Sequence, residues 1–78
     1  MNYSDFLTDE QKRDLLTQRI QQFAAEAYQH SLNLKVAELT GDAGAADHAA
    51  ASIANLDQAL QVHTEELNSL PAAETPAP

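Results

Sequence analysis

The chain has 78 residues, enough for one small domain, and its twelve acidic and four basic residues give it a formal charge of −8. So acidic a surface repels nucleic acid and anionic membranes, and we expect neither as a partner. The absence of cysteine excludes disulfides and thiolate metal sites. With no signal-peptide pattern at the N-terminus and no apolar run near the roughly 20 residues of a membrane span, we expect a soluble protein made without an export signal.

The chain opens with an apolar arm, residues 1–7, which carries Tyr3, Phe6 and Leu7. Residues 8–11 then match a capping box, in which the Thr8 side chain caps a helix and Gln11 reaches back to the Thr8 amide. The pattern predicts a helix over about 9–40, because no glycine or proline follows until Gly41. A glycine suits the left-handed conformation that ends many helices.

The predicted turn is residues 41–42, after which Asp42 can cap a second helix over about 43–70. Gly44 weakens the first turn of this helix, so its start could shift to Asp47. Pro71 cannot continue the helix, and it opens a tail of the polyproline II or disordered kind. The predicted organisation is an apolar arm (1–7), a helical hairpin (8–70) and a Pro/Ala-rich tail (71–78).

Apolar positions in both predicted helices recur at alternating intervals of three and four, the spacing of a coiled-coil seam. These positions are Leu16, Ile20, Phe23, Ala27, His30, Leu34 and Ala37 in the first helix, and Ala46, Ala49, Ile53, Leu56, Leu60, His63, Leu67 and Leu70 in the second. Folding back at residues 41–42 pairs the two runs in register, with Phe23 opposite Leu60 and Ile20 opposite His63. We therefore predict an all-α fold, an antiparallel two-helix hairpin resembling a coiled coil.

The first helix carries a second apolar stripe that faces away from the seam, and the second helix has no counterpart. Its members are Ala25, Tyr28, Leu32, Val36 and Leu39. An exposed apolar stripe typically marks an interface, unless the arm or the tail covers it. Because the seam alone is small, we expect no stable isolated monomer. The hairpin would join a larger helical bundle, for example a trimer, or dock on a partner through this stripe.

His30 and His63 fall on the seam, where a histidine can act as a pH switch or a register lock. The alternative is a packed histidine at the seam edge with one nitrogen in contact with solvent, Glu26 or Glu66. His48 is expected to be solvated.

We predict no metal-binding, cofactor-binding or catalytic residues. A di-metal bundle needs inward-facing Glu-x-x-His pairs, whereas Glu26 lies four residues before His30 and His63 precedes Glu66. The chain has no glycine-rich phosphate loop and no nucleophile paired with a base. A two-helix hairpin also lacks the interior for a small-molecule pocket of about 300 Å³. We therefore expect no enzymatic activity and no small-molecule substrate.

Residues 19–33, 41–42, 50–60 and 62–63 resemble a set of small proteins encoded by tailed bacteriophages and prophages. The most specific shared elements are Phe23, the Tyr28-Gln29-His30 triplet with Leu32-Asn33, and the Gly41-Asp42 turn. Genes of this set tend to lie among virion genes, often near tail or fibre genes. The resemblance implies a structural protein of the virion, made in the host cytoplasm, whose partners are tail, fibre or capsid proteins or further copies of itself.

The alternative function is an acidic hairpin that acts as a regulator or assembly chaperone on one host or phage protein. Residues 52–57 resemble the Ser-Gln-x-Leu-Asp motif of small helical-hairpin phosphatases, but they are one residue too long and lack the glutamine. This departure leaves the regulatory function as a hypothesis without a matching motif.

Overall fold

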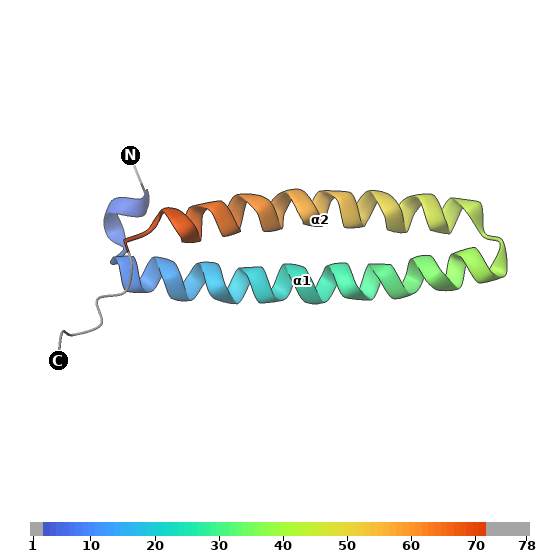
Figure 1. The fold of residues 1–78 in the computed structure, drawn as a ribbon, viewed down its shortest axis with the longest axis horizontal. Coiled ribbons are helices and arrows are strands. Elements are labelled where there is room, and N and C mark those ends of the chain that lie inside the picture. Colours follow the sequence, from blue (N-terminus) through green and yellow to red (C-terminus); the bar gives the residue numbers. More distant parts are fainter. Residues whose placement is uncertain (1–2, 72–78) are drawn as a thin grey trace.

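The protein is a helical hairpin in the computed structural model, which describes residues 3–71 (Figure 1). A short 3-10 helix, η1 (Tyr3–Phe6), precedes two long helices, α1 (Asp9–Thr40) and α2 (Ala43–Ser69). The long helices lie side by side and antiparallel, so that the start of α1 and the end of α2 meet at the end opposite the turn, here called the open end. This arrangement confirms the predicted all-α hairpin.

The start of α1 is fixed by the capping box expected from the sequence. The Gln11 amide donates to the Thr8 hydroxyl oxygen at 3.1 Å, and the Thr8 amide donates to the Gln11 side-chain oxygen at 2.9 Å. Two backbone N–H groups that the helix leaves free are thereby satisfied. Asp9 and Glu10 add negative charge at the positive end of the helix dipole.

The turn depends on Gly41, which has a φ of 73° and is the one residue with positive φ among residues 3–71. The Asp42 amide donates to the Ala37 carbonyl at 2.9 Å, and the Gly41 amide donates to the Glu38 carbonyl at 3.4 Å. These two bonds form a Schellman motif, which satisfies the last carbonyls of α1 and reverses the chain.

The start of α2 is fixed by Asp42, whose side chain accepts a hydrogen bond from the Ala45 amide at 3.0 Å. The helix begins at Ala43, so Gly44 does not delay its start to Asp47 as the sequence allowed. At the other end, Pro71 follows Leu70 and prevents continuation. The predicted tail lies outside the described residues except for Pro71.

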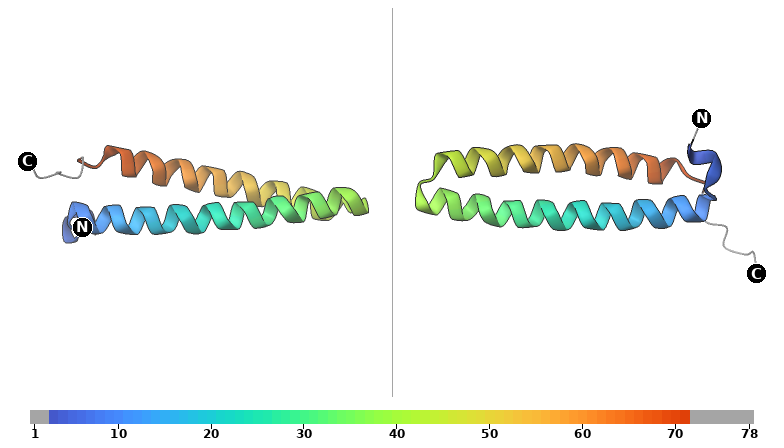
Figure 2. Two further views of the ribbon diagram at one scale, coloured as in Figure 1. Left: turned by 60° about the horizontal axis from the view of Figure 1, so that its bottom comes forward. Right: turned by 180° about the vertical axis from the view of Figure 1, so that it is seen from behind.

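The predicted seam faces the partner helix along its whole length, and every member is buried or half-buried. Only Ala37 and Ala49 are enclosed, with 4% and 3% of their surfaces exposed. Figure 2 shows the two helices diverging from the turn toward the open end. Large seam residues toward the open end, such as Leu16, Phe23 and Leu67, therefore lie where the helices are further apart, and two helices alone do not enclose them.

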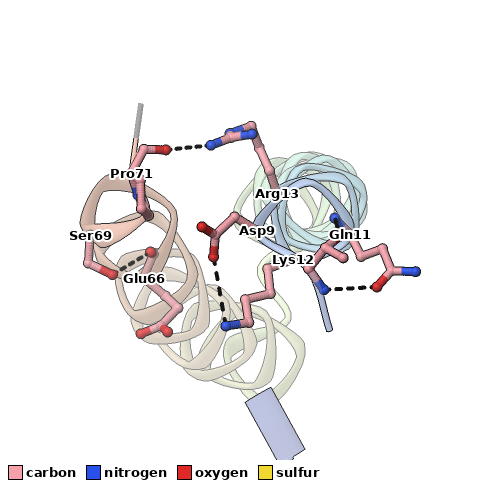
Figure 3. Close-up of polar contacts among 8 residues, drawn as sticks. Asp9, Gln11, Lys12, Arg13, Glu66, Ser69 and Pro71 are labelled. Carbon is pink, nitrogen blue, oxygen red and sulfur yellow. Dashed lines mark hydrogen bonds and ion pairs between the residues drawn. The ribbon is translucent and has the colours of Figure 1, made fainter. Parts of the chain in front are cut away.

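One long-range hydrogen bond ties the open end together. The Arg13 guanidinium donates to the carbonyl oxygen of Pro71, which follows α2 (Figure 3). Nearby, Lys12 forms an ion pair with Asp9 at 3.9 Å within the first turns of α1. The second contact is local to α1, whereas the bond from Arg13 links α1 to the segment after α2.

Candidate interaction surface

The second apolar stripe of α1 lies on the side of the helix opposite α2, and we call it the outer face. At about 100° per residue, Leu32 is rotated by about 180° from the seam residue Phe23. All five members are exposed. The exposed fractions of the four largest side chains are Tyr28 60%, Leu32 45%, Val36 59% and Leu39 88%.

The N-terminal arm does not cover the outer face. It forms η1 at the open end (Figure 1), whereas the outer face runs from the middle of α1 toward the turn. Tyr3 and Phe6 are themselves 82% and 70% exposed. Residues 3–7 of the arm therefore do not cover the stripe, and the alternative that the tail covers it falls on residues 72–78, outside the described part.

The outer face carries little of the acidic charge of the chain. After Asp14, the only carboxylates in α1 are Glu26 and Glu38. Each is rotated by about 120° from Leu32, toward the flanks of the seam. Lys35 lies next to Val36 and has no hydrogen bond or ion pair with any residue from 3 to 71. The surface around the stripe is thus neutral to weakly positive in a strongly acidic protein.

His63 packs at the edge of the seam, but its partners differ from those expected. Its Nδ1 lies 2.7 Å from the Ala59 carbonyl oxygen, and its Nε2 lies 3.3 Å from Arg19 Nε. A carbonyl can only accept and a guanidinium can only donate, so these contacts assign the proton of a neutral imidazole to Nδ1. Neither contact involves Glu26 or Glu66, which together with solvent were the alternatives expected for a histidine at the seam edge.

Phe23 connects this histidine to Arg19. The edge-to-face contact between the Phe23 and His63 rings has a centroid separation of 4.8 Å and an interplanar angle of 70°. The Arg19 guanidinium lies 5.3 Å from the centroid of the Phe23 ring, within range of a cation–π interaction. The three side chains form a structural contact between the helices, and Arg19 was not identified from the sequence.

The two long helices carry two more large exposed apolar side chains outside the outer face, of which Leu15 was not identified from the sequence. Leu15 is 46% exposed on α1 and Val62 is 62% exposed on α2. Leu15 directly precedes the seam residue Leu16, and the apolar pair gives no sign in the sequence that Leu15 is the exposed member. Neither belongs to a continuous stripe, so the outer face remains the strongest candidate surface.

The remaining polar groups do not converge on a site. His30 is half-buried on the seam, and His48 is exposed near the start of α2. Within residues 3–71, no three histidine or carboxylate side chains lie close enough together to hold a metal ion. A depression of about 280 Å³ beside the turn has a lining of Ala37, Glu38, Gly41, Asp42, Ala43 and Ala46. Its lining offers the carboxylates of Glu38 and Asp42, of which Asp42 caps α2, and no histidine, lysine or hydroxyl side chain.

Neither α1 nor α2 is long and apolar enough to cross a membrane, a finding that covers residues 3–71. Comparison of the chain with models of protein families, with curated proteins and with solved structures finds no match. The resemblance to phage-encoded proteins therefore remains a prediction from the sequence pattern.

Proposed function

We propose that this protein is a non-enzymatic structural component that binds other proteins, or further copies of itself, through the outer face of α1. The observation that carries the proposal is the exposure of Tyr28, Leu32, Val36 and Leu39, which lie in one stripe and are 45–88% exposed. Small soluble domains rarely leave such a stripe uncovered, because burying apolar surface is favourable.

The setting we propose is the virion of a tailed bacteriophage, and its support is the resemblance in residues 19–63. A slender hairpin with one apolar outer face can add to a larger helical assembly without a large globular core of its own. In this setting the outer face would bind a tail, fibre or capsid protein, or another copy of the chain.

The test compares an outer-face variant with a matched control on the other helix. Leu32→Glu/Leu39→Glu places two charges on the outer face, and Val62→Glu places one at a similarly exposed position of α2. Circular dichroism first establishes that both variants keep the helicity of wild type. Mass spectrometry of purified particles then measures incorporation, and we expect wild type and Val62→Glu in constant stoichiometry and the double variant depleted at least tenfold.

Two results would count against the proposal in different ways. If wild type is missing from particles despite strong expression in the infected cell, the virion setting fails and the regulator or chaperone function gains support. If the double variant enters particles as well as wild type, the outer face is not the docking surface.

A further inference from the structure

We propose that a second copy of this chain covers the outer face of α1, with the two α1 helices antiparallel about a twofold axis at Leu32. The inference rests on the proposed function, since it names the partner of the same face.

The outer face is symmetric about Leu32. Tyr28 lies four residues before it and Val36 four after, while Ala25 lies seven before and Leu39 seven after. In an antiparallel pair, Leu32 therefore meets Leu32 of the second copy. Tyr28 meets Val36 and Ala25 meets Leu39, so each outer layer pairs a larger side chain with a smaller one. Such layers fill space well, and a self-complementary patch is what a twofold dimer requires.

The charge along α1 is unevenly distributed. Its start holds three carboxylates, Asp9, Glu10 and Asp14, and two basic side chains, Lys12 and Arg13, so that residues 9–14 have a net charge of −1. With the axis at Leu32, the helices overlap only over about residues 24–40, so these carboxylates extend beyond the end of the facing helix. A parallel pair or trimer would instead place them beside their own copies, where like charges repel. Because Lys12 and Arg13 offset two of the three carboxylates, this repulsion is small, and it favours the antiparallel dimer by a small amount.

The charge around the outer face fits a second copy of this acidic chain better than a basic partner. A basic partner would gain most from the acidic parts of the surface, whereas the outer face holds Lys35 and no carboxylate between residues 27 and 37. Two chains of charge −8 can approach at this face with their carboxylates directed elsewhere. Salt screens the remaining repulsion over about 8–10 Å, so self-association should strengthen as the salt concentration rises.

The test uses single cysteines, because the native chain has none. A disulfide requires two Cα atoms about 4.4–6.8 Å apart. Under mild oxidation, Leu32→Cys should link into a dimer, while Leu39→Cys and Ala25→Cys should each stay unlinked alone and link when mixed. Val62→Cys, exposed on α2, is the control for random collision and should stay unlinked. Sedimentation of wild type should show a dimer that tightens with salt.

Two results would overturn the antiparallel dimer and leave the proposed structural function open. Efficient self-linking of Leu39→Cys would indicate parallel packing. A wild-type monomer at all salt concentrations, with no linking of Leu32→Cys above the Val62→Cys control, would exclude the second copy. Loss of the Leu32→Glu/Leu39→Glu variant from particles would then still assign the outer face to another protein. Conversely, the dimer stands if cysteine linking succeeds and the chain is missing from particles.

Discussion

The two ends of the hairpin bury their seam residues to different extents. Near the turn, the small side chains of Ala37 and Ala49 are almost completely enclosed. Toward the open end, Phe23, Leu60 and Leu67 are only half-buried, although they are far more hydrophobic. Enclosure by two helices is thus limited by side-chain size and by the separation of the helices, and hydrophobicity alone does not predict it.

This difference has an energetic consequence. At the turn end, stability depends on close approach, which a larger side chain would prevent. At the open end, it depends on apolar contact area and on contacts such as that between Phe23 and His63. A small-to-large substitution should therefore destabilise the turn end, and a large-to-small substitution should destabilise the part toward the open end. Urea unfolding at a fixed chain concentration can measure each loss in the free energy of unfolding.

The largest expected effect is at Phe23, near the middle of α1 on the side toward the open end. Phe23→Ala should lower the free energy of unfolding by about 3 kcal/mol, the lower end of the range for buried phenylalanines, because the ring is half-buried. It also removes the ring that contacts both His63 and Arg19. Val62→Ala, which removes an exposed apolar side chain, should change stability by less than about 0.5 kcal/mol. Equal losses in the two variants would show that the half-buried seam contributes no more than the surface.

At the turn end, Ala49→Leu should destabilise the protein by about 2 kcal/mol, because the larger side chain forces apart helices that enclose all but 3% of Ala49. Ala54→Leu inserts the same side chain at an exposed position of α2 and is the control. We expect it to be close to neutral in urea unfolding at the same chain concentration. A gain in stability from Ala49→Leu would mean that the helices near the turn can accommodate a larger side chain. The contrast between close packing at the turn and partial burial toward the open end would then be wrong.

The smallest expected effect separates backbone geometry from packing at the turn. Gly41→Ala should cost about 1 kcal/mol, because its φ of 73° is unfavourable for residues with a Cβ, although an added Cβ would meet nothing within 4 Å. Gly44→Ala, inside α2, should instead stabilise by about 0.5–1 kcal/mol through helix propensity. Its added Cβ would lie at an ordinary 3.7 Å from an Asp42 oxygen. Thermal or urea unfolding should show shifts of opposite sign, and shifts of the same sign would contradict the Schellman geometry.

Much of the fold could be predicted from the sequence because the relevant signals are local. The capping box at Thr8, the break at Gly41 and the cap at Asp42 each act within a few residues. The seam is also periodic, and a short turn permits one antiparallel register. The stripe on the outer face followed from the same periodicity, since residues that do not face the seam of a two-helix hairpin must face outward.

Only the tertiary structure decided how the two helices meet and what each long side chain contacts. The choice of Arg19 over Glu26 or Glu66 as the partner of His63 depends on the separation and rotation of the helices. The bond from Arg13 to Pro71 joins groups that are 58 residues apart in the chain. The enclosure of Ala37 and Ala49, but not of the larger seam residues toward the open end, depends on the divergence of the helices from the turn. Periodicity specifies the direction in which a side chain points, but the distance to the facing helix comes from packing along its whole length.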